Sequence, residues 1–142
     1  MKKDMTTLPM IFNTLHKKMM EKHHDILNSY NLSKVHMPYL LIISDHQEGI
    51  TQKAMTNVLF MDKAHASRAL KDLLNKAMIN KDDETVYKNK YYLTDLGKKV
   101  VEDIRTSSMK MREKIILALT PEEIDAFRKL SEKLVSVIDT LD

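Results

Sequence analysis

The sequence predicts a mostly helical protein of one domain, residues 1–142, with one small β-hairpin and long helices at both ends. Two observations predict this class. The chain contains only two glycines and three prolines, which leaves little material for irregular loops. Apolar residues recur every three or four positions over most of the chain, and strand-forming residues replace that pattern only between residues 80 and 94. A chain of 142 residues is long enough to bury a core without disulfides or metals.

The first predicted helix covers residues 5–31. A threonine shortly before Pro9 is typical of a helix start, and the apolar residues that follow keep a period of 3.6 for about twenty positions. We expect Asn31 to end this helix and Ser33 to cap the next one. That second helix contains the dense apolar segment 37–43, which indicates burial on most of its sides.

Residues 50–79 are predicted to form two short helices joined by a tight corner, with Thr51 as the cap of the first helix and Asp62 as the cap of the second. One face of the second helix is apolar and should pack, whereas the opposite face carries small and donor side chains. The residues of the apolar stripe are Ala66, Ala69, Leu70, Leu73, Leu74 and Ala77. Lysine and arginine can reach phosphates or guanine edges, and small residues allow close approach to DNA. The candidate DNA-contacting residues of the two helices are Thr51, Gln52, Lys63, Ala64, His65, Ser67, Arg68 and Lys71.

Positive charge is concentrated around this helix pair. Residues 51–99 hold ten lysines and arginines against six acidic residues, a net charge of +4, while the rest of the chain has 13 against 14. A local positive excess is what a phosphate-binding surface requires. Most amphipathic helices with exposed lysines and arginines are only solvated. The segments on either side of the helix pair are therefore needed to distinguish a DNA-binding surface from a solvated one.

Residues 80–94 are predicted to form a β-hairpin. Val86 and the tyrosines on either side of Lys88 to Lys90 favour strands, and the acidic and polar residues before them favour a turn. A hairpin that follows a helix pair of this kind is called a wing. Residues 33–94 are therefore predicted to form a winged helix-turn-helix.

Four sequence motifs follow one another along the chain: Ile50–Lys53, Asp62–Leu70, Leu93–Gly97 and Leu119–Glu123. These motifs and the order of the elements resemble the MarR (multiple antibiotic resistance regulator) family of winged helix-turn-helix transcription factors, over essentially the full chain. The resemblance implies a transcriptional regulator that binds double-stranded DNA, as a homodimeric repressor of a pseudo-palindromic operator. It also implies release by a small apolar or phenolic effector.

The sequence departs from the family's pattern in the wing and at two helix ends. Thr85 and Tyr87 stand where the family has Asp-x-Arg, whose arginine enters the minor groove. Phe60 and Ala77 stand where glycine is common, so we expect the corners there to be built differently. The candidate DNA-contacting residues of the wing are Lys88, Asn89 and Lys90.

Residues 95–141 are predicted to form two long helices. The first has an apolar stripe of about seven turns, and Thr120-Pro121-Glu122-Glu123 is typical of a helix start with a capping box. The stripes of residues 5–31 and 95–141 are larger than one small winged domain can cover. A homodimer would bury them, and so would a monomeric bundle; the family resemblance favours the dimer.

Composition excludes several classes of function. The chain has no cysteine, which removes disulfides, thiol catalysis and cysteine–zinc sites. The six histidines form no compact ligand motif, and glycine-rich phosphate loops and nucleophile–base sets are missing, so we expect no metal, no cofactor and no enzyme. No run approaches 18 apolar residues and the first residues lack a signal-peptide core, which predicts a soluble cytoplasmic protein with no membrane partner.

Two further hypotheses concern what the protein binds. Methionine-lined gaps between the terminal helices and the winged part could hold an apolar effector, and the candidate effector-binding residues are Phe12, Met19, Tyr39 and Ile43. The alternative to a DNA-binding regulator is a helical protein–protein interaction module whose basic central face docks an acidic partner. Such a module would not need the Leu-Thr-x-x-Gly sequence after a hairpin.

Overall fold

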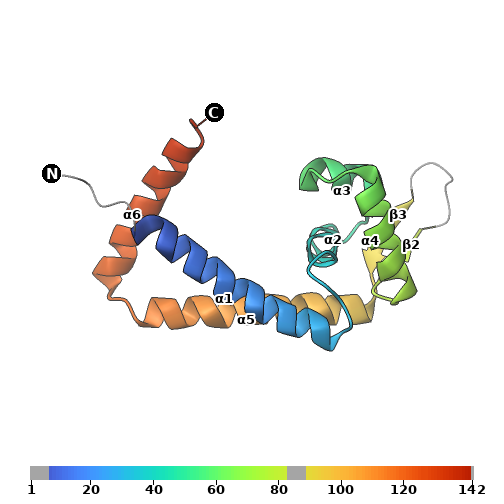
Figure 1. Cartoon of the computed structure of the whole chain (residues 1–142), viewed down its shortest axis with the longest axis horizontal. Coiled ribbons are helices and arrows are strands. Elements are labelled where there is room, and N and C mark those ends of the chain that lie inside the picture. The colour runs from blue at the N-terminus through green and yellow to red at the C-terminus, as the bar shows by residue number, and fades with distance from the viewer. Residues whose placement is uncertain (1–6, 83–88, 142) are drawn as a thin grey trace. The chain divides into compact units, whose positions relative to one another are not determined.

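The structure is a computed structural model that describes residues 7–82 and 89–141 (Figure 1). The described residues form helices and one small antiparallel sheet, which confirms the predicted fold class. The chain divides into two compact units, residues 1–107 and 108–142. In chain order the elements are α1 (Thr7–Ser29), α2 (Met37–Ser44), β1 (Ile50–Thr51), α3 (Gln52–Leu59), α4 (Lys63–Asn75), β2 (Ile79–Lys81), β3 (Lys90–Leu93), α5 (Asp95–Leu117) and α6 (Pro121–Ile138).

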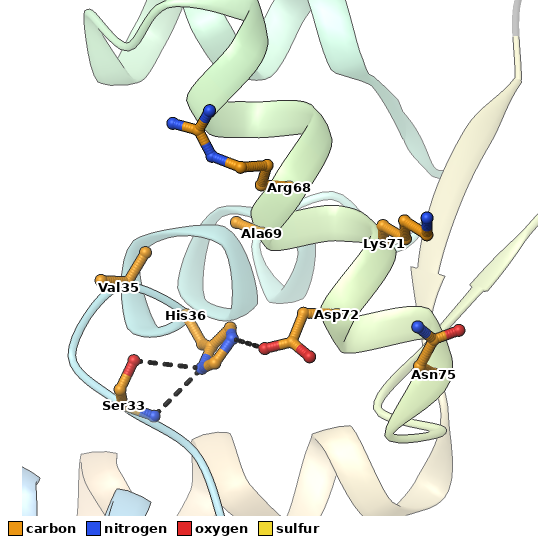
Figure 2. Close-up of a pocket in the computed structure, with 8 residues that line it drawn as sticks. All are labelled: Ser33, Val35, His36, Arg68, Ala69, Lys71, Asp72 and Asn75. Atoms are coloured by element: carbon orange, nitrogen blue, oxygen red, sulfur yellow. Dashed lines mark hydrogen bonds and ion pairs between the residues drawn. The ribbon is translucent and has the colours of Figure 1, made fainter.

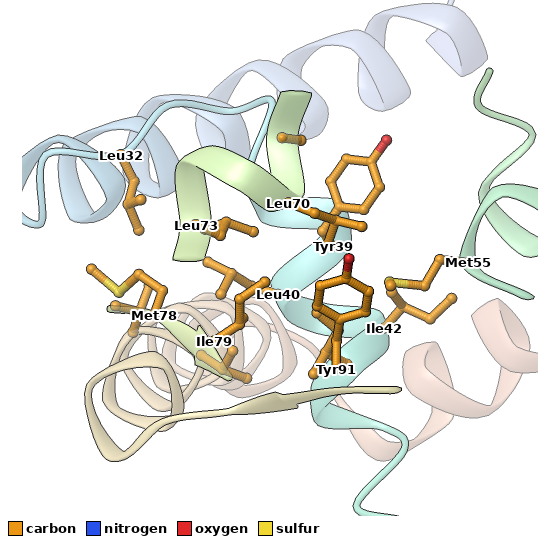
Figure 3. Close-up of a cluster of buried hydrophobic side chains, with 14 of the residues drawn as sticks. Leu32, Tyr39, Leu40, Ile42, Met55, Leu70, Leu73, Met78, Ile79 and Tyr91 are labelled. Atoms are coloured by element: carbon orange, nitrogen blue, oxygen red, sulfur yellow. The ribbon is translucent and has the colours of Figure 1, made fainter. Parts of the chain in front are cut away.

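The core of the first unit is built around α2. Four of the eight residues of this helix are buried, and Figure 3 shows Leu40 beside Leu73 of α4 and Ile79 of β2. This confirms the burial that the apolar segment 37–43 predicts. Each large apolar side chain removed from water in this way contributes about 1.5–3 kcal/mol before the entropy cost of ordering it. The helix therefore serves as the support on which α4 and the sheet rest.

The sheet has the order β1-β3-β2 with antiparallel pairs. Ile50 lies opposite Tyr91, and Asn80 lies opposite Tyr92, so the two tyrosines are strand residues as predicted. The predicted strand residues Val86 and Tyr87 lie outside the described residues. The sequence did not predict β1, because two residues are too few to show an alternating pattern.

The Leu93–Gly97 segment joins the wing to α5 through side-chain contacts that need its threonine and glycine. Thr94 Oγ1 donates to the Ala77 carbonyl oxygen at 2.6 Å and accepts from the Gly97 N–H at 3.1 Å. A Cβ at Gly97 would lie 2.1 Å from the Met78 carbonyl oxygen, so any larger residue would push α5 away from the end of α4. The threonine and the glycine of this motif thus fix how closely the start of α5 packs against the end of α4.

Three helices of the first unit end in the same way, with a left-handed residue that is not glycine. Asn31, Phe60 and Ala77 have φ values of 57°, 52° and 56°. After each of them a backbone N–H returns to a carbonyl five residues earlier, as from Met61 to Thr56 at 3.2 Å, which is the Schellman arrangement. Asn31 therefore ends α1 as predicted. The expectation of a different corner at Phe60 and Ala77 is wrong, because both adopt the conformation that glycine would adopt.

Ser33 does not cap α2, which corrects the prediction. The helix begins at Met37 with His36 as its N-cap residue. Ser33 instead lies in the preceding turn, where its backbone N–H donates to His36 Nδ1 at 3.0 Å. The pattern of a serine before an apolar run predicted a cap, but the helix starts three residues later than that pattern suggests, next to Pro38 in its first turn.

The second unit consists of the end of α5 and all of α6. Thr120 Oγ1 accepts from the Glu123 N–H at 3.2 Å and the Glu123 carboxylate accepts from the Thr120 N–H at 2.9 Å, which confirms the predicted capping box. No residue of α6 is buried within the chain. Its apolar side chains, including Phe127 at 63 % exposure, form an uncovered stripe.

Candidate nucleic-acid interface

Two side-chain caps hold the helix pair α3–α4 in place. Thr51 Oγ1 accepts from the Ala54 N–H at 3.2 Å, and Asp62 Oδ1 accepts from the His65 N–H at 2.7 Å. Both caps were predicted from the sequence, because a cap bond joins residues only three positions apart. The carboxylate of Asp62 also complements the positive end of the α4 dipole. The start of α4 is therefore fixed by its own sequence.

Helix α4 packs with one face and exposes the other. The buried face holds Ala66, Ala69, Leu70 and Leu73, as the periodicity predicts. Ala77, which we expected to close this stripe, is exposed, because it lies in the left-handed turn after the helix. The opposite face is exposed at five of the six candidate positions on α4: Lys63, Ala64, Ser67, Arg68 and Lys71.

The sixth candidate on α4, His65, is half-buried and bonded to the core. Its Nδ1 lies 2.8 Å from the hydroxyl oxygen of Tyr39, and the two rings stack with centroids 5.9 Å apart. Tyr39 has 0 % exposure, and burial together with the charge of Asp62 raises the pKa of its hydroxyl. The sequence predicted the two residues for different sites, and the structure brings them together.

Gln52, at the start of α3, reaches across to α4. Its Nε2 donates to Ser67 Oγ at 2.9 Å and lies 3.4 Å from the carbonyl oxygen of Lys63. Two predicted DNA-contacting residues are thus hydrogen-bonded to each other. The contact ties the first turns of the two helices, so the side chains of Gln52 and Ser67 lie close together on one exposed surface.

A shallow pocket of about 440 Å³ lies beside the exposed face of α4 (Figure 2). At its base His36 Nε2 lies 2.5 Å from Asp72 Oδ2. Since His36 Nδ1 accepts from the Ser33 N–H, the ring proton is on Nε2 and is donated to Asp72. Figure 2 shows Arg68 and Lys71 pointing away from this pair.

The contact between His36 and Asp72 was missed at the sequence level. The two residues are 36 positions apart, and neither belongs to a recognisable motif. The pair connects the turn before α2 to the last turn of α4, one helical turn beyond Arg68. It therefore braces the helix that carries most of the candidate residues.

The structure describes two of the three candidate DNA-contacting residues of the wing. Lys88 lies outside the described residues. Lys90 is half-buried in β3, opposite Thr51, and Asn89 directly precedes that strand. The start of α3 and the described part of the wing are therefore neighbours through the sheet, which places Thr51 and Lys90 side by side.

The structure places the four candidate effector residues in different surroundings. Phe12 is exposed and Met19 is half-buried on α1, whereas Tyr39 and Ile43 are buried in α2. Ile43 lines a cavity of about 370 Å³ together with residues of β3 and the start of α5, and the other three candidates do not line it. Within residues 7–82 and 89–141, no group of three or more His, Cys, Asp or Glu side chains could hold a metal ion.

The described elements form a winged helix-turn-helix fold with long terminal helices. Within residues 7–82 and 89–141 no helix is both long and apolar enough to cross a lipid bilayer. No protein-family model and no curated protein matches the sequence. Solved structures do match the fold, among them MepR and a MarR transcriptional regulator.

Three of these structures show how far the likeness extends. A mutant of MepR from Staphylococcus aureus is 22 % identical, with a TM-score of 0.76 over 92 % of this chain and 97 % of that one. The MepR–DNA complex from the same organism is 22 % identical, with a TM-score of 0.68 over 90 % and 95 %. A MarR transcriptional regulator from Methanosarcina mazei is 16 % identical, with a TM-score of 0.70 over 98 % and 94 %. The chain therefore has the MarR-type fold over nearly its whole length.

Proposed function

We propose that the protein is a transcriptional regulator of the MarR family that binds double-stranded DNA sequence-specifically and has no catalytic activity. The observation that carries this proposal is the exposed face of α4, which presents Lys63, Ser67 and Arg68 while the opposite face is anchored in the core. An exposed helix with donors in its first turns has the shape and chemistry that a major groove accepts. A solved structure of the same fold was determined with DNA, which supports the proposal.

The contacts on DNA divide into two kinds. Arg68 is the candidate for a guanine edge, because its guanidinium can bond O6 and N7 together. Lys63, Lys71 and the wing residues Lys88 and Lys90 are candidates for phosphate contacts, which position the protein without reading sequence. Replacing Lys88 and Lys90 together by alanine should make the slope of log K against log salt concentration shallower, by an amount equal to about two phosphate contacts. An unchanged slope would exclude the wing from the DNA interface.

We further propose that the protein acts as a homodimer. The apolar stripe of α6 supports this, because its large hydrophobic residues are exposed in the single chain. Without a partner these side chains would stay in contact with water. A second copy related by two-fold symmetry offers an identical stripe. Two copies of α4 would then read half-sites about 10 bp apart in a pseudo-palindrome.

A finer proposal is that the protein represses its operator and that a small apolar or phenolic effector releases it. The cavity lined by Ile43 supports this proposal, because about 370 Å³ falls within the size range of small-molecule sites. A ligand there would touch α2, the wing strand β3 and α5 together. Titrating simple phenols into a preformed complex should lower operator affinity; constant affinity across such a panel would exclude this mode of control.

The proposed function is tested by selecting binding sites from a library of random duplexes at two salt concentrations, followed by sequencing. Enrichment of a pseudo-palindrome would support the dimeric reader, and Arg68→Ala should then lose the enrichment. Salt-sensitive binding without any preferred sequence, or no binding, would contradict the proposal. In that case the helical protein–protein interaction module becomes the better interpretation, and acidic partner proteins would be the next ligands to test.

A further inference from the structure

Two candidate DNA-contacting side chains of α4 are hydrogen-bonded to residues of other helices. His65 is bonded to Tyr39 of α2, and Ser67 is bonded to Gln52 of α3. Each of these bonds fixes whether a polar group of the α4 side chain donates or accepts toward the protein. The protein's own contacts therefore determine which hydrogen-bonding roles remain for DNA.

The contact with Tyr39 decides which nitrogen of His65 carries the proton. Tyr39 is fully buried, so water does not satisfy its hydroxyl proton, and His65 Nδ1 is the acceptor 2.8 Å away. A buried donor without an acceptor is unfavourable, so the hydroxyl donates and Nδ1 accepts. The raised pKa of Tyr39 is consistent with a hydroxyl that keeps its proton. In the neutral ring, the proton of His65 is then on Nε2.

The contact with Gln52 decides the role of the Ser67 hydroxyl in the same way. The amide group of Gln52 faces both Ser67 Oγ and the carbonyl oxygen of Lys63. An amide oxygen in that place would oppose the carbonyl oxygen, so the nitrogen occupies it and donates to Ser67. Ser67 Oγ therefore accepts from the protein, and its own proton can be donated outward.

We propose that the first two turns of α4 offer hydrogen-bond donors to DNA at His65 and Ser67, and that they therefore favour base edges rich in acceptors, above all guanine. This inference rests on the proposed function. In the major groove guanine offers two acceptors, N7 and O6, and thymine offers O4. Adenine offers N7 beside an amino group, and cytosine offers only an amino group, which needs an acceptor. Tyr39 and Gln52 are positioning residues in this scheme. The donors are the ammonium of Lys63, Nε2–H of His65, O–H of Ser67 and the guanidinium of Arg68.

The tautomer of His65 can be measured without DNA, by nitrogen–proton correlation of the imidazole groups in the full chain at about pH 8, where unperturbed histidine is neutral. We expect His65 to carry its proton on Nε2. Tyr39→Phe keeps the ring but removes the hydroxyl, so the two tautomers should then mix. Tyr91→Phe, which changes another buried tyrosine, should leave His65 as it is. A proton on Nδ1 in the parent protein, or a Tyr39→Phe spectrum equal to the parent's, would overturn the inference.

The base preference is tested on the selected operator by replacing single bases beneath α4. A 7-deazaguanine, which lacks the N7 acceptor, should weaken binding about three- to tenfold, the effect of one hydrogen bond. Purine in place of adenine lacks the N6 amino group and should change nothing. A loss with purine would overturn the inference and leave the proposed function standing, whereas the absence of any selected operator would overturn both.

A double-variant cycle tests whether Tyr39 acts through His65. Tyr39→Phe should weaken operator binding about threefold, the lower end of the effect of one hydrogen bond. In a His65→Ala background it should have no further effect, because the bond that it removes no longer exists. Tyr91→Phe is the matched control and should bind like the parent. Equal losses in both backgrounds would show that Tyr39 only stabilises the fold, which contradicts its positioning role.

Discussion

Helix α4 of the first unit and helix α6 of the second both carry apolar residues at spacings of three and four, but their apolar faces differ in burial. In α4, Leu70 and Leu73 are at most 1 % exposed, packed against the rest of their own unit. In α6, Phe127 and Leu130 are more than half exposed. The same sequence pattern therefore has two outcomes. In α4 the polar face is exposed and available to a ligand, whereas in α6 the apolar face is exposed.

The largest expected effect comes from a substitution in the buried apolar face of α4. Leu73→Ala should lower the free energy of unfolding by about 2–5 kcal/mol, because it removes a fully buried side chain and leaves a cavity. Urea unfolding followed by circular dichroism measures this change. Lys71→Ala on the exposed face of the same helix is the control and should stay within about 0.5 kcal/mol of the parent. A loss below 0.5 kcal/mol for Leu73→Ala would contradict the packing of α4.

A substitution in the exposed apolar face of α6 should affect assembly of the dimer instead of folding. Phe127→Glu places a charge in the proposed interface and should weaken the dimer by about 2 kcal/mol or more, as loss of a central aromatic anchor does. Sedimentation equilibrium over a range of concentrations measures the dissociation constant. Lys133→Glu introduces the same carboxylate at an exposed polar position of α6 and should leave the dimer intact. A parent protein that stays monomeric at all concentrations would refute the proposed interface.

The free face of α4 should matter for DNA and not for stability. Arg68→Ala should weaken binding to the selected operator by about 1–3 kcal/mol and relax the preference at one base pair. Its unfolding midpoint should equal that of the parent, because the side chain is exposed. Lys110→Ala, an exposed cation in the second unit, serves as the control in a fluorescence anisotropy titration. If both variants bind equally well, Arg68 does not read a base.

The smallest expected effect distinguishes a helix end from a helix interior. Ala77→Gly should stabilise the protein by about 0.5–1 kcal/mol, because glycine relieves the left-handed φ of 56° and its greater freedom when unfolded offsets only part of that gain. Ala126→Gly inside α6 should instead destabilise by about 1 kcal/mol. Thermal unfolding of both variants gives the signs. Destabilisation by Ala77→Gly would show that this residue is not strained.

Local patterns predicted the features that depend on neighbouring residues. The caps at Thr51, Asp62 and Thr120 were foreseen, because each joins groups three positions apart. The buried face of α4 followed from helical periodicity alone. The misplaced cap at Ser33 shows the limit of such patterns, since a serine before an apolar run does not fix where the helix begins.

The sequence by itself determined the order of the helices and of the hairpin, the exposed and buried faces of α4 and the location of most DNA-contact candidates. Only the tertiary structure decided which of those candidates are held by partners. The contacts of His65 with Tyr39, Ser67 with Gln52 and His36 with Asp72 join residues 26, 15 and 36 positions apart. No local pattern encodes such pairs, because they form only when separate helices pack against one core. The polar atoms that α4 can offer to a ligand depend on these long-range contacts as much as on its own sequence.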